Sequence, residues 1–551
     1  MKKLFSLILC FAMLFSIAAC GAPQSKDKDN ATEPVADKTE AAEEKSEDKK
    51  TEEKTEEKTE EKTGEEKPED KKTSDDKNKE YKDTIVIVTE KEPDTLDPRR
   101  GNSVSNNIVM NQVYDALFYL DEGGQPQSRL AESWELVDDT TLKVKLKEGI
   151  VFSNGNPLTA DDVLYCLERT LHDSTSRSTM EWYDPDNSTK EDDHNFTIKM
   201  KQPYAPAYWV LSGWRCWIGD KETMESMGEE NHARAPIGTG PYKLVNWVTG
   251  SQIELERNEN YWGDLAKTEK VIMKFVPEPA NRVIELETGA ADIAYYINGV
   301  DRDRVNNMPN AHAESGLSPK YYLVTFNMQH ELLSNQNVRN ALSYAIDVPQ
   351  LADVAFDGQA TAMTGMYPSV FRHHKVIEGG FPYDPELAKK ELAEAGHPDG
   401  FDIELHILPG AEYQRMAEVI QAYWQKIGVN ARIEQSELGT REAQGPWETS
   451  IRTATADEIS NVLIIYEQSF ASRINSNDDV MEEKLQKLKT LYDDANRKAL
   501  LEDIQDYLFE KKYTLPFVEV DTIYGVSDKV ENFEFNEAIA LLEIANWQVE
   551  K

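Results

Sequence analysis

One stretch of the chain restricts the fold more than any other, because it cannot form part of a core. Residues 21–80 contain no aromatic residue and no Leu, Ile or Met, and they carry 22 acidic against 14 basic residues. Within them, the run TEEKTEEKTEEKTGEEKPEDKK at residues 51–72 repeats a four-residue unit almost unchanged. Such a segment buries too little apolar surface to offset the entropy lost on ordering. We therefore expect a disordered, charged tether over residues 21–82, at least about 40 to 45 Å from end to end.

A single charged helix is the alternative for this tether, because Glu and Lys four residues apart pair on a helix surface. The Thr at every fourth position weakens that alternative, since Thr is a poor helix former. In either form the segment acts as a spacer between the N-terminus and the folded body.

The first twenty residues have the pattern of an export signal. Two lysines precede an apolar run from Leu4 to Ile17, which is too short for a comfortable membrane span. The run ends in Ile-Ala-Ala-Cys, which resembles the bacterial lipobox, so residues 1–20 are expected to be a lipoprotein signal peptide. Cys20 would then carry acyl chains such as palmitate, which at about 0.8 kcal/mol per buried methylene hold a protein on a membrane. An ordinary signal with a chance cysteine is the alternative.

Charge and motifs exclude several functions. The formal net charge of −40 repels phosphate, so we expect no nucleic-acid partner. The sequence contains no CxxC pair, HExxH, P-loop or G-x-S-x-G elbow, and we expect no cofactor, no metal and no enzymatic activity. The adjacent His373 and His374 point apart on any regular element, so a solvated loop pair is favoured over a metal site.

Two cysteines remain after the signal and the anchor. Cys166 lies in DDVLYCLERT, which has a helical pattern, and a small buried thiol is the favoured interpretation. A disulfide with Cys216 is the alternative, because disulfides are permitted outside the cell.

The body from about residue 83 alternates strand and helix signals. TIVIVTE, TLKVKLKEGI and HNFTIKMK are expected strands. FDIELHIL, AEYQRMAEVIQAYWQKIG and VNARIE predict a βαβ unit that ends its helix at Gly428. In YDPELAKKELAEAG, Asp384 is the expected N-cap, Pro385 opens the helix and Gly396 ends it. A chain of 551 residues exceeds one hydrophobic core, so the architecture is α/β in at least two lobes.

Several of these stretches carry a resemblance to one family. PDTLDP at 93–98, YDALF at 114–118, LAESWE at 130–135 and LKEGIVFSNGNPLTADDVLYCLER at 146–169 resemble the amino-terminal half of the family 5 extracellular solute-binding proteins. The likeness continues through PIGTGPYKLVNWVTGSQIELERNENYWG, ELETGAADI, NVRNALSYAID, YDPELAKKELAEAG and RMAEVIQAYWQKIGV, in the family's order. These proteins are the dipeptide- and oligopeptide-binding components of ABC importers.

The resemblance implies a periplasmic-binding-protein-like fold of the large peptide-binding type, with a hinge that the chain crosses twice. Lobe one would comprise residues 83–327 and a return segment, 516–551, and lobe two would be the insertion at residues 328–515. A short peptide would lie extended in the closing cleft and form β-type hydrogen bonds with both lobes. The receptor, expected to be a monomer, would deliver the peptide to permease subunits. A non-peptide solute such as a nickel chelate, haem or an oligosaccharide is the alternative, followed by a surface peptidase.

The resemblance also implies site residues. The segment from Arg99 to Asn106 resembles the lobe-one strand that pairs with the ligand, so Asn102, Ser103 and Val104 are candidates; a plain surface loop is the alternative. In lobe two, WETSIRTATADEIS falls where the family has a strand ending in an acid that binds the ligand's α-ammonium. This strand would contribute Thr453, Ala454, Thr455, Ala456 and Asp457, with Asp457 the acid. Where the family's strand has Gly-Trp, this chain has Thr453 and Ala454. The alternative is that Asp457 is an ordinary surface acid.

Arg415 is the remaining candidate. We expect it in the first turn of a helix that follows a strand, where the helix dipole disfavours a cation and where ligands of α/β sheets lie. Its RMAE context resembles the arginine that clamps the ligand carboxylate in dipeptide-binding members, and a guanidinium fits that group. A surface pair with Glu412 or Glu418 is the alternative. With its anchor and spacer, the protein is expected on the outer face of the cell membrane of a Gram-positive-type bacterium.

Overall fold

A computed structural model describes residues 79–101, 103–121, 125–356, 360–436, 447–455, 476–536 and 541–551, together with Leu463, Tyr466 and Ile474. The expected signal peptide, Cys20 and nearly all of the expected tether lie outside these residues, as do Asn102, Ala456 and Asp457. Within the described part of the chain, no helix has the length and apolar character that crossing a membrane requires.

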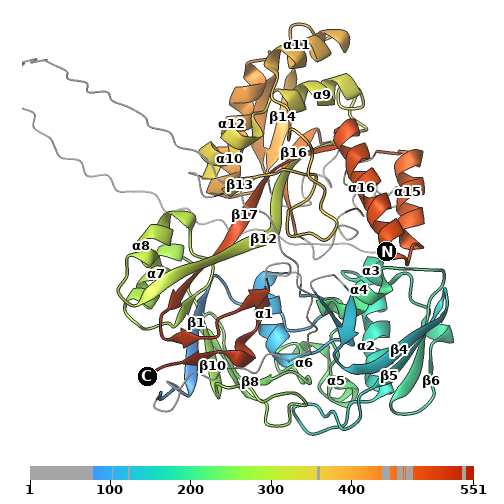
Figure 1. The fold of residues 1–551 in the computed structure, drawn as a ribbon, viewed down its shortest axis with the longest axis vertical. Coiled ribbons are helices and arrows are strands. Elements are labelled where there is room, and N and C mark those ends of the chain that lie inside the picture. Colours follow the sequence, from blue (N-terminus) through green and yellow to red (C-terminus); the bar gives the residue numbers. More distant parts are fainter. Residues whose placement is uncertain are drawn as a thin grey trace, which may run out of the picture. The chain divides into compact units, whose positions relative to one another are not determined.

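A mixed sheet of 11 strands organises the described residues (Figure 1). Its order is β15-β14-β16-β12-β17-β11-β1-β10-β9-β8, and β13 pairs with β17 beside this path. The strands are β1 (Thr84–Thr89), β8 (Tyr242–Val248), β9 (Gln252–Arg257), β10 (Lys270–Phe275), β11 (Ile293–Ala294), β12 (Ala311–Phe326), β13 (Ala360–Ala362), β14 (Asp402–Ile407), β15 (Asn430–Gln435), β16 (Thr449–Thr455) and β17 (Thr514–Ser527).

Smaller sheets are attached to this framework. A four-stranded sheet has the order β4-β5-β7-β6, and three strand pairs are formed by β2 with β3, β18 with β21 and β19 with β20. Their bounds are β2 (Phe118–Leu120), β3 (Pro126–Ser128), β4 (Ala131–Asp138), β5 (Thr141–Leu146), β6 (Thr189–Lys190), β7 (Asn195–Lys199), β18 (Val530–Glu531), β19 (Phe535–Asn536), β20 (Leu541–Leu542) and β21 (Gln548–Val549).

The helices are α1 (Val104–Val113), α2 (Ala160–His172), α3 (Arg177–Met180), α4 (Ala207–Ser212), α5 (Lys221–Met227), α6 (Glu229–His232), α7 (Pro279–Glu287), α8 (Arg302–Asn306), α9 (Gln336–Tyr344), α10 (Val348–Phe356), α11 (Pro385–Glu394), α12 (Ala411–Gln425), α15 (Asp479–Lys489) and α16 (Asp494–Lys511). The expected α/β fold class is therefore confirmed.

Two long strands, β12 and β17, connect the two ends of the large sheet. They pair antiparallel from Ala311 with Ser527 to Thr325 with Thr514. The largest hydrophobic cluster is built from buried residues between Tyr321 and Val518. A second cluster lies between Leu117 and Met224, and two more combine residues up to Ala311 with the segment from Ile523 onward. The long strands thus pass from one set of cores to another.

The predicted local structure is confirmed where the sequence pattern is strongest. Strands β14 and β15 pair in parallel around α12, which makes the expected βαβ unit. Asp384 caps α11 by accepting hydrogen bonds from the amides of Glu386 and Leu387. The strand predictions at β1, β5 and β7 are also correct.

Cys166 and Cys216 are free, buried thiols rather than a disulfide. Burial raises the pKa of Cys166 to about 11 and the pKa of Cys216 to about 12. Neither group is therefore ionised near neutral pH, which confirms the favoured interpretation.

The histidine pair differs from the prediction. The side chain of His373 is only 7% exposed and its Nε2 lies 3.2 Å from Asp494 Oδ1, while His374 Nδ1 lies 2.9 Å from the Tyr367 carbonyl. The two rings do contact different partners, but they are packed rather than solvated. Burial lowers the pKa of both histidines, and the described residues contain no cluster of metal-ligating side chains.

The predicted end of the tether at residue 82 is wrong. Residues 79–82 already contact the body: Tyr81 donates to Glu531 at 2.8 Å, and Lys82 Nζ lies 2.7 Å from Asp292 Oδ1. The Lys82 amide further donates to the Val549 carbonyl. Composition hides this boundary because the partners Asp292, Glu531 and Val549 lie at least 210 positions further along the chain.

Candidate ligand-binding site

The first candidate segment begins a helix instead of forming a strand. Ser103 is the N-cap of α1, and its Oγ accepts a hydrogen bond from the Asn106 amide. Val104 is the first helical residue. The predicted strand from Arg99 to Asn106 is therefore wrong, because the cap directs the chain into a helix directly after the turn. A ligand role for Ser103 and Val104 stays a prediction.

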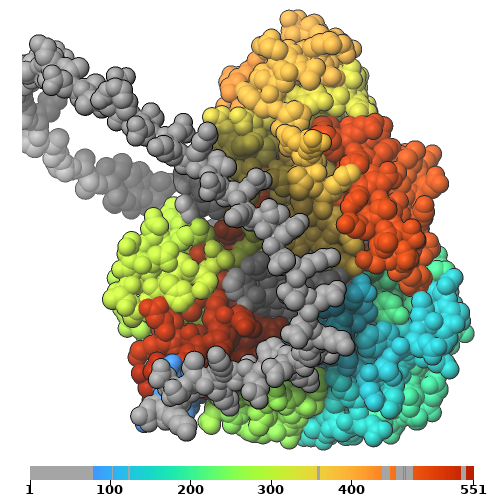
Figure 2. All heavy atoms as spheres, in the orientation of Figure 1, coloured from blue at the N-terminus to red at the C-terminus, as the bar shows by residue number. Residues whose placement is uncertain are grey.

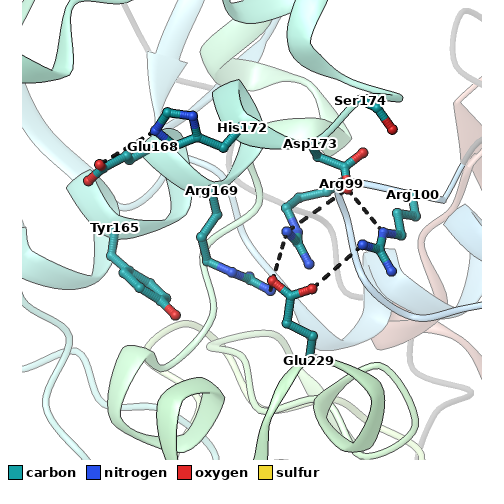
Figure 3. A pocket seen from close by; sticks show the side chains of 9 residues that line it. All are labelled: Arg99, Arg100, Tyr165, Glu168, Arg169, His172, Asp173, Ser174 and Glu229. Atoms are coloured by element: carbon teal, nitrogen blue, oxygen red, sulfur yellow. Dashed lines mark hydrogen bonds and ion pairs between the residues drawn. The ribbon is translucent and has the colours of Figure 1, made fainter.

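A charge network around the buried Arg99 holds the turn that precedes Ser103 (Figure 3). The Arg99 guanidinium lies 2.5 Å from Asp97 and 3.1 Å from Glu229 of α6, and its side chain is 7% exposed. Arg100 binds Asp173 at 3.0 Å and lies 3.5 Å from Glu229. Because these partners are fixed on α2 and α6, the turn at residues 97–101 is rigidly placed.

The pKa shifts agree with this network. Burial would raise the pKa of Asp97, but the hydrogen bonds and charge of Arg99 outweigh it and lower the pKa overall. The hydrogen bond from Arg99 lowers the pKa of Glu229. Nearby His232 is buried, and burial together with the charge of Arg169 lowers its pKa to about 4. At neutral pH the network therefore consists of ionised pairs beside a neutral imidazole.

Arg99, Arg100, Arg169, Asp173 and Glu229 also line a concave pocket of about 530 Å³. Figure 3 shows Arg99, Arg100 and Arg169 converging on Glu229, which lies within 3.7 Å of all three guanidinium groups. With Asp97 and Asp173 nearby, the arginines are neutralised by resident carboxylates. The ion pairs around the pocket therefore hold the turn in place. They leave no excess positive charge in the pocket for an anionic ligand.

Strand β16 carries the second group of candidates. Thr453 pairs with Tyr322 of β12, Ala454 with Tyr321 and Thr455 with Lys320. On its other side, β16 pairs with β14 at Thr449 and Ser450 alone. Among the described strands, none covers that second edge at residues 453–455. This edge can accept one more extended segment.

The end of β16 lies beside the point where β12 and β17 cross. Three residues of β12, Ser318 to Lys320, oppose the single residue Val520, since Leu317 pairs with Asp521 and Tyr321 with Glu519. Such a bulge interrupts the ladder and bends the strand. Pro319 suits the bulge because it has no amide hydrogen to donate.

Two carboxylates flank Val520 on β17 and are held from opposite directions. Glu519 is buried and accepts hydrogen bonds from the Ser369 amide at 2.8 Å and from its hydroxyl at 3.2 Å. Asp521 lies 3.0 Å from the guanidinium of Arg302 on α8. The chain on either side of Val520 is therefore fixed to a different set of elements.

Arg415 lies apart from both places. It is an exposed residue one turn into α12, so the prediction of a first-turn position is wrong: the helix begins at Ala411. It lines a pocket of about 500 Å³ between α10 and α12, and no residue of β16 lines that pocket. Glu412 accepts from the Tyr322 hydroxyl and Glu418 from the Gln414 amide. The carboxylate role of Arg415 stays a prediction.

Sequence reasoning missed the bulge at Ser318 to Lys320 and the charge network on the Arg99 turn. Pro319 within a strand pattern was the available signal for the bulge. The network had no signal, because its partners are up to about 130 positions apart in the sequence.

The chain has two α/β halves that share one sheet through the long strands β12 and β17. This arrangement is the fold of the two-lobed binding proteins. The ABC transporter-associated periplasmic binding protein DppA of Helicobacter pylori, solved in complex with the peptide STSA, matches with a TM-score of 0.72 at 23% identity, over 85% of this chain and 98% of that one. The family model of the bacterial extracellular solute-binding proteins, family 5, matches residues 125–474. The chain belongs to this family.

Curated relatives agree with this assignment. The glutathione-binding protein GsiB of Escherichia coli K12 is 28% identical over 470 residues, which cover 82% of this chain and 91% of the relative. Heme-binding protein A of Haemophilus influenzae is 30% identical over 379 residues, covering 63% of this chain and 69% of the relative. These relatives are named as binding proteins and not as enzymes.

Proposed function

We propose that the chain is a receptor for short peptides that serves an ABC importer, and that the peptide adds as a strand to the free edge of β16 at residues 453–455. The observation that carries this proposal is that no described strand pairs with this edge of β16 beyond Ser450, beside the crossing strands. Main-chain hydrogen bonds along an edge supply affinity common to all peptides. The names of GsiB and of the peptide-bound DppA support the same ligand class.

The proposed lobes follow the cores. Lobe one would comprise residues up to β12 and the segment after β17, and lobe two would be the part between them, as the sequence predicts for residues 83–327, 328–515 and 516–551. The bulge at Ser318 to Lys320 and Val520 would be the hinge, because the flanking carboxylates are tied to different elements. Ligand would then favour a closed arrangement of the lobes.

The strand-addition proposal is tested with peptides that differ only in a backbone donor. Mass spectrometry of solute released from the purified protein identifies a natural ligand first. Titration calorimetry then compares Ser-Thr-Ser-Ala with its N-methylated analogues and with tetra-alanine. Loss of one ladder hydrogen bond without a replacement should weaken binding at least about tenfold, whereas tetra-alanine should bind within about threefold. Equal affinity for all N-methylated peptides contradicts the proposal.

The proposed charge clamps are tested by substitution. If Asp457 holds the ligand ammonium, Asp457→Ala should weaken binding of a free-amino peptide by at least about thirtyfold, because a buried charge loses its partner. Arg415→Ala should affect dipeptides more than pentapeptides, whose carboxylate would lie elsewhere. If N-acetylation and Asp457→Ala both leave affinity within about threefold, the ammonium site is misplaced.

A non-peptide solute is the second candidate function, favoured by the relative named heme-binding protein A. The released solute decides between the two. A peptidase assay addresses the third possibility, and product formation would overturn the binder proposal.

The proposed location combines the anchor and the spacer. Cys20 would be acylated, and residues 21–78 would hold the receptor away from the outer face of the cell membrane, within reach of its permease. Cys20→Ala should release the protein from cells into the medium, as measured by fractionation and immunoblotting. A variant that stays cell-bound contradicts the lipid anchor.

A further inference from the structure

Contacts away from the crossing strands also join the two proposed lobes. The loop between α15 and α16 meets the segment that leads into α4, and Figure 1 shows the ends of α15 and α16 above α3 and α4. The Tyr492 hydroxyl donates to the Asp139 carbonyl at 3.0 Å and accepts from the Tyr204 amide at 3.0 Å. The Ala205 amide donates to the Lys489 carbonyl at 2.6 Å. Three hydrogen bonds therefore connect positions 139–205 with positions 489–492.

A buried cation strengthens this contact. The Arg497 guanidinium carbon lies 4.2 Å from the centre of the Trp209 ring, and Arg497 is only 1% exposed. A guanidinium over an indole face is most favourable when it is desolvated. Figure 2 shows the red surface of α15 and α16 in contact with the cyan and green surface of the proposed lobe one.

Opening the lobes would break all of these contacts. The crossing strands can bend at the bulge opposite Val520 while the chain remains connected, but the contacts at Tyr492 and Trp209 exist only when the lobes meet. Every group involved belongs to the protein, so the contacts need no ligand to form. They stabilise the closed arrangement independently of whatever the cleft binds.

We propose that Tyr492, Trp209 and Arg497 form an interlobe latch that keeps a fraction of the ligand-free receptor closed and sets how much binding energy closure requires. This inference rests on the two-lobed receptor function proposed above. A stronger latch makes the closed form more populated and raises the apparent affinity for every ligand, since affinity scales with the competent fraction.

The exchange rates of two amide hydrogens measure how often the latch opens. Tyr204 and Ala205 donate across the lobes, and Pro203 and Pro206 on either side have no amide hydrogen. In hydrogen–deuterium exchange mass spectrometry, a peptide spanning residues 201–206 therefore reports these two amides, because label at its second residue, Gln202, is lost by rapid back-exchange. The experiment uses the full chain, freed of co-purified solute by unfolding, dialysis and refolding, with no ligand added.

Trp209→Leu should speed exchange of this peptide by about tenfold, because it removes a desolvated cation–π contact. Tyr492→Phe removes both interlobe hydrogen bonds of the hydroxyl, so it should speed exchange of this peptide by about tenfold, the effect of two net hydrogen bonds. Trp214→Leu is the matched control, since Arg215 lies 4.0 Å from that ring within lobe one. Tyr507→Phe is the second control, because its hydroxyl bonds Asp478 within lobe two. Both controls should leave the peptide at the wild-type rate.

Strands β5 and β7 show whether lobe one remains folded. Faster exchange at residues 201–206 with unchanged protection in these strands supports the latch. If Trp209→Leu loosens β5 and β7 as well, Tyr492→Phe in the other lobe provides the decisive measurement. Wild-type exchange at the unprotected rate, or equal rates in latch and control variants, would overturn the proposal. Because no peptide is added, failure of the peptide-binding proposal leaves these results unaffected.

Discussion

Asp115 shows how a single residue ties together motifs that lie far apart in the sequence. Its carboxylate accepts from Arg129 Nε at 2.6 Å, from the Thr239 hydroxyl at 2.9 Å and from Trp262 Nε1 at 3.1 Å. Asp115 lies in YDALF, Thr239 in TGPY and Trp262 in NENYW, and Arg129 directly precedes LAESWE. The family resemblance in these stretches therefore reflects, at least at Asp115, the requirements of one buried carboxylate.

Removing this carboxylate should be strongly destabilising. Asp115→Ala leaves the Arg129 cation and two buried donors without their acceptor, at an expected cost of about 3 kcal/mol in the free energy of unfolding. Urea unfolding checks this. Glu287→Ala is the control, because it removes an exposed pair with Arg304 at 2.6 Å and should change stability by less than about 0.5 kcal/mol. Equal effects of the two substitutions would contradict the assigned role of Asp115.

Lys512 is a buried cation that makes stability depend on pH. It is 4% exposed, and its Nζ donates to the Phe509 carbonyl at 2.5 Å. Burial lowers its pKa from 10.5 to about 8. Between these two values the unfolded chain binds the proton and the folded chain does not, so stability rises with pH across this window.

The free energy of unfolding should therefore gain up to about 3 kcal/mol from Lys512 between pH 8 and pH 10.5. Lys512→Met should abolish this gain and stabilise the protein at pH 7 by about 2 kcal/mol, after loss of one hydrogen bond. Urea midpoints measured from pH 7 to 9.5 give the slope. The adjacent Lys511→Met is the control and should keep the wild-type slope.

At the scale of elements, the β14–α12–β15 unit depends on two glycines that meet. Gly400 precedes β14 and Gly428 precedes β15, with φ values of +79° and +86°. A Cβ on Gly400 would lie 1.9 Å from the Gly428 carbonyl oxygen. The parallel pairing therefore starts from a backbone contact that only glycine permits.

Gly400→Ala should combine left-handed strain with a backbone clash and cost at least about 3 kcal/mol. Gly396→Ala is the matched control, because its φ is +91° and nothing lies within 4 Å of the added Cβ. That control should cost about 1 to 2 kcal/mol, from strain alone. Thermal unfolding of both variants measures the difference in stability. An equal loss of stability in the two variants would show that the backbone near Gly428 moves away from the added Cβ.

At the scale of the whole folded body, β12 and β17 carry the proposed hinge, and the proposed latch would oppose its opening. Because the Ala205 amide bonds the Lys489 carbonyl at 2.6 Å, the two Cα atoms lie within reach of a disulfide, which spans about 4.4 to 6.8 Å. A cross-link at this place would fix the lobes together.

Ala205→Cys combined with Lys489→Cys should therefore form a disulfide on oxidation. The oxidised protein should exchange bound Ser-Thr-Ser-Ala at least about tenfold more slowly than the reduced protein, because exchange requires opening. Mass spectrometry checks the cross-link and fluorescent peptide displacement checks the exchange. Each single-cysteine variant should behave as wild type, and unchanged exchange in a fully cross-linked sample would contradict hinge opening.

Local signals in the sequence were enough to predict the βαβ unit, the Asp384 cap, the buried thiols and the family. Periodicity and caps depend on residues within a few positions, so they can be read along the chain. The contact of Arg99 with Glu229, the contact of Tyr492 with Asp139 and the pairing of β16 with the other described strands became evident in the three-dimensional structure alone. Those contacts join residues from about 130 to 350 positions apart, and ion pairs, strand edges and interlobe contacts leave no periodic trace. Their placement follows from how the β-strands pair and pack in space.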